Sequence, residues 1–118
     1  MNVRLARWIL ACVLLVVPVC AQAASELDQL TSVAFKAIRK HKQVRQGLPQ
    51  TCVLLVNFHL EGDWAQGDLR EKHDAKCGGD PGTAPRLTTI WVQRASKKVF
   101  VEDLEGNKVA IERYRPAK

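Results

Sequence analysis

The sequence predicts an α+β protein in which one N-terminal helix packs on an antiparallel sheet of four to five strands. Apolar residues first recur at the spacing of a helix, and from Thr51 onward they form short segments typical of strands. Gly, Asp, Asn and Ser residues separate these segments, as in consecutive hairpins. One disulfide is also expected, because two cysteines remain once an N-terminal signal is removed.

The beginning of the chain has the features of a secretory signal peptide. Arg4 and Arg7 precede an uninterrupted apolar run over residues 8–17, and the small residues Ala21 and Ala23 match a signal peptidase site. The run is shorter than the ~20 residues that a transmembrane helix needs. We therefore expect cleavage after Ala23, export to the periplasm or the medium, and no transmembrane segment after processing.

Removal of residues 1–23 would leave a single domain over residues 24–118, which has 95 residues because 118 minus 23 is 95. That length suits one hydrophobic core. This domain has 16 Lys and Arg against 12 Asp and Glu, a formal charge of +4. The excess favours anionic partners such as lipid or glycan. It is too scattered for nucleic acid, whose binding proteins concentrate positive charge on one face.

The cysteines of the exported domain are Cys52 and Cys77, since Cys12 and Cys20 lie in the predicted signal. In an oxidising compartment we expect these two to form a disulfide rather than a reactive or metal-binding site. Closing a loop of about 25 residues would contribute roughly 3.5 kcal/mol in the chain-entropy model. Lipidation is disfavoured, because Cys20 lacks a small preceding residue and Cys12 lies too early in the apolar run.

The helix is predicted to begin near Ser25, which can cap free backbone amides with Asp28 at the fourth position of a capping box. Gly47 and Pro49 should end it. Its apolar residues recur at helical spacing and comprise Leu27, Leu30, Ala34, Ala37 and Ile38.

The other face of this helix is basic. It is either a solvated surface or a contact surface for anionic lipid or lipopolysaccharide. Its cations are Lys36, Arg39, Lys40, Lys42 and Arg45.

Five extended segments follow the helix. The first is rich in Val, Leu and Phe, and the second is more polar and contains the interruption Gln66-Gly67-Asp68. Turn residues separate each segment from the next. The segments cover residues 52–60, 64–76, 87–94, 99–101 and 109–111.

The order of one helix followed by hairpin-linked strands resembles the cystatin-like and PepSY-like architectures of small exported bacterial proteins. Residues 91–101 resemble a common strand-turn-strand in which a short polar turn precedes a Lys-Val step. This resemblance implies the fold class and no active site.

Residues 73–85 resemble a signature found in small, largely uncharacterised secreted bacterial proteins. The signature reads His-Asp-x-x-Cys-Gly-Gly-Asp-Pro-x-Thr-x-Pro, and every position of it is present. The resemblance implies an exported family without a known activity, and it transfers no substrate or catalytic role.

This segment is also predicted to be a stiff surface loop. Glycines permit unusual backbone angles, prolines fix others, and the disulfide would tie the base of the loop to the first strand. Stiff loops on rigid scaffolds often bind partners. The alternative is a purely structural turn. The candidate binding residues are His73, Asp74, Gly78, Gly79, Asp80, Pro81, Thr83 and Arg86.

Catalysis is not expected from this sequence. His73 and Asp74 are adjacent, so on a strand they would point to opposite faces rather than converge on a substrate. A metal site at His59, His73 and Asp74 lacks standard ligand spacing, and no cofactor is expected.

The sequence favours a non-enzymatic binding module with a protein partner in the cell envelope, such as an inhibitor, an immunity-type protein or an envelope-stress factor. The alternative is a protein that binds anionic lipid or lipopolysaccharide through its basic helix face.

Overall fold

The computed structural model describes residues 19–116, with side chains described from Ser25 onward. Residues 1–18 of the expected signal peptide therefore lie outside the described residues. Over residues 19–116, no helix is long and apolar enough to cross a membrane. The elements in order are α2 (Val19–Lys40), η1 (Gln50–Cys52), β1 (Val53–Glu61), β2 (Trp64–Glu71), β3 (Arg86–Gln93), β4 (Val99–Glu102), β5 (Lys108–Ala110) and η2 (Ile111–Arg113).

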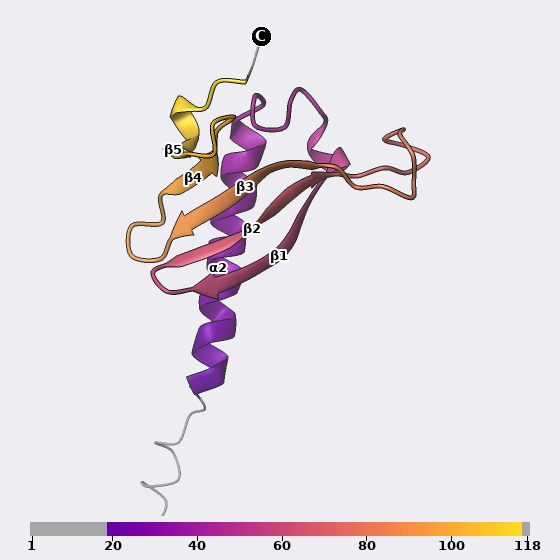
Figure 1. Ribbon diagram of the computed structural model, residues 1–118. Coiled ribbons are helices and arrows are strands. Elements are labelled where there is room, and N and C mark those ends of the chain that lie inside the picture. The colour runs from indigo at the N-terminus through magenta and orange to yellow at the C-terminus, as the bar shows by residue number, and fades with distance from the viewer. Residues whose placement is uncertain (1–18, 117–118) are drawn as a thin grey trace, which may run out of the picture.

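The five strands form one antiparallel sheet in the order β1-β2-β3-β4-β5, so each strand pairs with the next along the chain. The helix α2 lies across one face of this sheet, and the other face is left open (Figure 1). This arrangement confirms the predicted α+β fold with one helix, an antiparallel sheet and one disulfide.

Alternation along the strands determines which side chains face the helix. In β2 the buried positions are Ala65, Gly67 and Leu69, and the residues between them are partly exposed. The same period of two recurs in β3 and β4. Because neighbouring side chains on a strand point to opposite faces, β2, β3 and β4 supply every second residue to the core.

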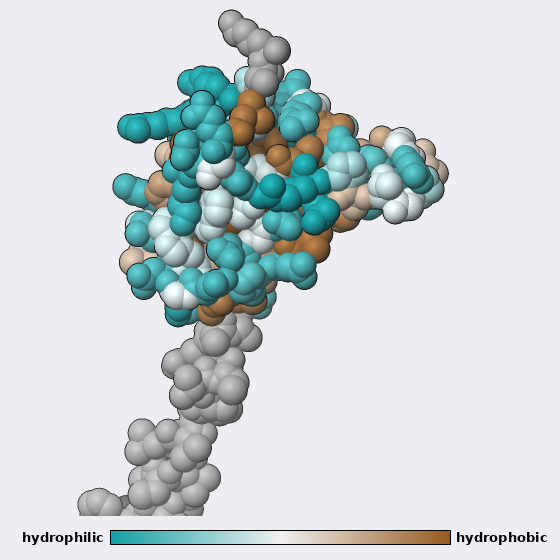
Figure 2. All heavy atoms as spheres, in the orientation of Figure 1, coloured by the Kyte–Doolittle hydropathy of each residue, from teal (hydrophilic) through white to brown (hydrophobic). Residues whose placement is uncertain are grey.

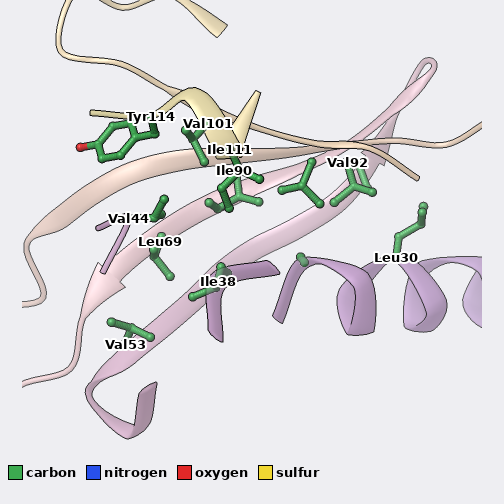
Figure 3. Close-up of a cluster of buried hydrophobic side chains, with 13 residues drawn as sticks. Leu30, Ile38, Val44, Val53, Leu69, Ile90, Val92, Val101, Ile111 and Tyr114 are labelled. Carbon is green, nitrogen blue, oxygen red and sulfur yellow. The ribbon is translucent and has the colours of Figure 1, made fainter. Parts of the chain in front are cut away.

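The core lies between α2 and the sheet. Leu30, Ala34 and Ile38 recur every fourth residue of the helix and are at most 1% exposed. They pack with buried residues of the strands, among them Ile90 and Val92 (Figure 3). The predicted apolar face of the helix is therefore the face that packs on the sheet.

The ends of the helix differ from the prediction. The helix already begins at Val19 and Ser25 lies inside it, because the alanine-rich segment around Ala23 favours helix. It ends at Lys40 rather than near Gly47. The chain then turns because the Arg45 side chain binds the last helical carbonyls, with Nε donating to the oxygen of Ile38 at 3.0 Å.

A β-bulge explains the Gln66-Gly67-Asp68 sequence in the second strand. The register of β1 against β2 shifts between Val56 and His59, and Asn57 there has a φ of 54°. A Cβ on Gly67 would lie 2.9 Å from the Cα of Phe58. Gly67 therefore admits the bulged strand and does not interrupt β2, although β2 ends at Glu71 rather than at Lys76.

Candidate functional site

The loop that joins β2 to β3 contains most of the residues that the sequence marks for recognition. This β2–β3 loop comprises residues 72–85 and extends away from the sheet in Figure 1. It forms a separate protrusion in the space-filling view of the same orientation (Figure 2). The loop therefore stands clear of the domain body, where a partner can reach it.

The base of the loop is tied to the beginning of β1. Cys77 forms the predicted disulfide with Cys52, with 5.5 Å between their Cα atoms. The amide of Lys72 donates to the carbonyl of Cys52 at 2.8 Å, and the amide of Glu71 donates to Pro85 at 2.8 Å. These contacts hold both ends of the loop against the sheet.

Asp74 fixes the first half of the loop. Its Oδ1 accepts the backbone N–H groups of Cys77 at 2.7 Å and of Lys76 at 2.9 Å. The hydrogen bond from Cys77 is the main reason that the pKa of Asp74 lies below its ordinary value, and the Lys72 ammonium 3.7 Å away also lowers it. The Asp74 carboxylate thus faces into the loop and holds its backbone.

His73 links the two ends of the loop to its middle. Its Nε2 lies 3.1 Å from a carboxylate oxygen of Glu71, and its Nδ1 lies 3.0 Å from the carbonyl oxygen of Asp80 and 3.1 Å from the Thr83 hydroxyl. The Glu71 carboxylate and the Asp80 carbonyl raise the pKa of His73. Protonated His73 can donate from both nitrogens, so the imidazolium suits this position best.

The far half of the loop is a compact turn. The Thr83 amide donates to the carbonyl of Asp80 at 3.0 Å, and the Gly82 amide donates to the Asp80 side chain at 2.9 Å. Gly79 has a φ of 81°, and a Cβ there would lie 2.6 Å from the His73 ring. Glycine is therefore required for the imidazole to reach the turn.

These contacts divide the predicted recognition residues into two groups. His73, Asp74 and Thr83 direct their polar atoms into the loop, where they hold its shape. Asp80 and Pro81 are exposed, as is Lys76 between them and Asp74. The surface offered to a partner therefore consists of these exposed groups.

Arg86 lies on the sheet rather than at the tip of the loop. It is the first residue of β3, and its guanidinium pairs with Glu102 of β4 and with Asp68 of β2. The Glu102 carboxylate raises the pKa of Arg86. Arg86 therefore ties three neighbouring strands together on the open face of the sheet.

The predicted basic helix face is only partly assembled. Lys36, Arg39, Lys40 and Lys42 are exposed. Arg45 is only 8% exposed, and its guanidinium donates to the carbonyls of Ile38, Arg39 and Leu48. Four of the five cations can therefore meet an anionic partner, and the fifth caps the helix.

An aromatic cluster on the open face was missed by sequence reasoning. The Nζ of Lys108 lies 3.9 Å from the ring centroid of Trp64 and 4.7 Å from that of Trp91. Trp64 also meets Phe100 edge to face, with 5.4 Å between centroids. The period of two in β2 and β3 places both tryptophans on the outward face, but only the strand register brings them together.

Metal-binding side chains do not converge in the part of the chain that the structure describes. Over residues 19–116, no group of three or more His, Cys, Asp or Glu residues could hold a metal ion. The candidates His59 and His73 instead pair with the carboxylates Glu61 and Glu71 of the same chain, each at 3.1 Å. These histidines therefore have local partners on the sheet and in the loop.

No protein-family model matches the chain, and neither a curated protein nor a solved structure does. Its function must therefore be inferred from its own residues.

Proposed function

We propose that the chain is exported and acts as a non-enzymatic binding module of the cell envelope, with the β2–β3 loop as its contact surface for a protein partner. Roles as an inhibitor, an immunity-type protein or an envelope-stress factor all fit such a module. The Cys52–Cys77 disulfide is consistent with an oxidising compartment. The resemblance of residues 73–85 to secreted bacterial proteins agrees with export.

The internal bonding of the loop is the observation that carries this proposal, because it indicates a stiff loop. The loop combines one disulfide with internal hydrogen bonds in which His73 contacts the Asp80 carbonyl and the Asp74 and Asp80 carboxylates accept backbone N–H groups. A preordered loop loses little conformational entropy when it binds, so more of its contact energy remains as affinity. A connection that only reversed the chain direction could be much shorter than the 14 residues of the range 72–85.

The surroundings of His73 support a binding role rather than catalysis. Both ring nitrogens have partners inside the loop, and Asp74 is occupied by backbone amides. A general base needs a free nitrogen within reach of a substrate proton. These side chains are committed to loop structure instead.

Site-specific photocrosslinking in cells tests the proposal. A photoreactive amino acid in place of Lys76 or Pro81 should yield one discrete adduct, because both positions are exposed on the loop. The same residue in place of Glu105, which is exposed in the turn between β4 and β5, is the matched control. An equal adduct from position 105, or none from positions 76 and 81, would reject the loop as the contact surface.

The second candidate function is binding to anionic lipid or lipopolysaccharide through Lys36, Arg39, Lys40 and Lys42. It is favoured by their exposure, and among residues 19–116 none of the four has a carboxylate oxygen within 4.0 Å. Cosedimentation with vesicles containing an anionic phospholipid tests it. Binding should fall steeply as salt is raised, whereas a loop contact with a protein should persist.

A further inference from the structure

A groove of about 660 Å³ lies between the C-terminal half of α2 and the chain segments at the β4–β5 edge of the sheet. One wall is formed by α2 and the beginning of the following turn. The other wall is formed by residues 97–100, at the beginning of β4, and by residues 110–113, which include η2. Its volume is within the range of small-molecule sites in proteins.

The floor of this groove is apolar. Val33 and Ala37 of α2 are half-buried there, and Val99 and Ile111 from the opposite wall are buried. All four belong to the hydrophobic core or pack against it. Val33 and Ala37 are thus the accessible part of a floor that continues into the core, and an aliphatic chain placed on it would leave water.

The rim of the groove is strongly basic. Five cations line it, and all are exposed: Lys36, Lys40, Lys97, Lys98 and Arg113. Glu112 is the one carboxylate among the lining residues. Within residues 19–116 none of the five cations has a carboxylate oxygen within 4.0 Å. Such a rim attracts a negative charge placed above the apolar floor.

We propose that this groove binds one anionic lipid, with an acyl chain on the floor and a phosphate headgroup at the Lys36–Lys98 rim. A peptide would also need hydrogen-bonding partners for its backbone, whereas the floor offers four apolar side chains. Charge complementarity selects the headgroup and the apolar floor selects the chain. The proposal rests on the second candidate function and adds a single-molecule site to it.

Calorimetric titration of the purified protein with alkyl phosphates below their micellar concentrations tests the floor. Affinity should increase from inorganic phosphate through octyl to dodecyl phosphate, by up to about fourfold for each added methylene that is buried. Dodecyl phosphate should also shift the backbone NMR signals of Val33, Ala37 and Ile111. No binding of dodecyl phosphate, or an affinity independent of chain length, would overturn the proposal.

Charge reversal tests the rim. Lys36→Glu with Lys98→Glu changes one cation on each wall and should weaken dodecyl phosphate binding about tenfold or more. Lys76→Glu with Lys108→Glu makes the same change in net charge at exposed positions outside the groove and should change the affinity less than about threefold. Equal losses in the two variants would contradict a specific site.

Glu112→Lys provides an independent test, because it removes the single carboxylate of the rim at an exposed position. It should strengthen dodecyl phosphate binding several-fold, and unchanged or weaker binding would contradict the proposal.

Vesicle cosedimentation distinguishes failure of the groove from failure of the second candidate function. Salt-sensitive vesicle binding without dodecyl phosphate binding would reject the groove and keep the second candidate function, whereas failure of both assays would reject both.

Discussion

His73 is the residue on which the shape of the β2–β3 loop depends most. Its side chain is 15% exposed and contacts Glu71 at the base, Asp80 in the turn and Thr83 beyond it. Imidazolium donates to both sides, whereas neutral imidazole can donate from only one nitrogen. The loop is therefore expected to be better ordered when His73 is protonated.

This protonation predicts a pH dependence of stability. The folded pKa of His73 is raised above its ordinary value of 6.5, so the folded state holds the proton more tightly than the unfolded chain. The contribution of His73 protonation to the unfolding free energy should be complete below pH 6.5. It should disappear as pH rises through the raised pKa of His73. The difference in unfolding free energy between wild type and His73→Gln, measured from pH 5 to 9, should follow this course.

His59 provides the control for that titration, because the Asn57 carbonyl and Glu61 also raise its pKa. In His59→Gln the His73 ring should keep its raised pKa in an NMR titration. A His73 ring that titrates at or below 6.5 would contradict the bonding described for the loop.

The lowered pKa of Asp74 has the opposite effect on the pH dependence of stability. The stabilisation from the Asp74 carboxylate should be lost only as pH falls through that lowered value.

Arg45 and Lys42 are cations of the same basic segment, but Arg45 is buried and structural whereas Lys42 is exposed. Arg45→Ala would remove the donors to the carbonyls of Ile38 and Arg39 at the end of the helix and to that of Leu48 in the following turn. It should lower the unfolding free energy by about 2–4 kcal/mol. Lys42→Ala, at an exposed neighbouring position, should change it by less than about 0.5 kcal/mol. Urea unfolding of both variants measures the difference, and similar midpoints would contradict the capping role.

Among the elements, α2 has the clearest division between a buried and an exposed face. Ile38 is 1% exposed, so Ile38→Asp would bury an unpaired charge and should cost more than about 4 kcal/mol. Lys42→Asp follows the helix at an exposed position and should cost about 1 kcal/mol at most. Thermal unfolding checks both, and equal melting temperatures would contradict the packing of α2 on the sheet.

The sheet could be predicted from sequence because its contacts are local in order. Each strand pairs with the next, and turn residues separate the strands. The end of the helix could not be predicted, since it depends on where the Arg45 side chain reaches. Gly67 suggests an interruption of the second strand when that segment is taken alone, because the bulge that it accommodates lies in the partner strand.

The candidate sites were predictable to different extents. The sequence predicts the loop because its Cys, Gly and Pro residues lie within one short segment, over residues 77–85, and determine its structure locally. The aromatic cluster and the groove escaped prediction because they combine distant segments. Lys36 and Lys98 are 62 positions apart, as 98 minus 36 is 62, and only the packing of α2 beside β4 brings them to one rim.

The proposed function requires that the whole molecule be exported and oxidised. Protein purified from the periplasm should begin at Ala24 and contain no free thiol, because cleavage after Ala23 leaves only the bonded pair Cys52 and Cys77. Intact mass before and after alkylation without reductant measures both properties. Two alkylated cysteines, or retention of residues 1–23, would contradict the exported state.

Asp80→Ala tests whether the β2–β3 loop is a preordered contact surface rather than a structural turn. The exposed Asp80 side chain accepts one backbone hydrogen bond from Gly82, whereas its carbonyl, which binds His73 and Thr83, is retained in alanine. The unfolding free energy should therefore fall by about 1 kcal/mol at most, while partner crosslinking from position 76 should fall several-fold. A large loss of stability with crosslinking intact would instead identify the loop as a structural turn.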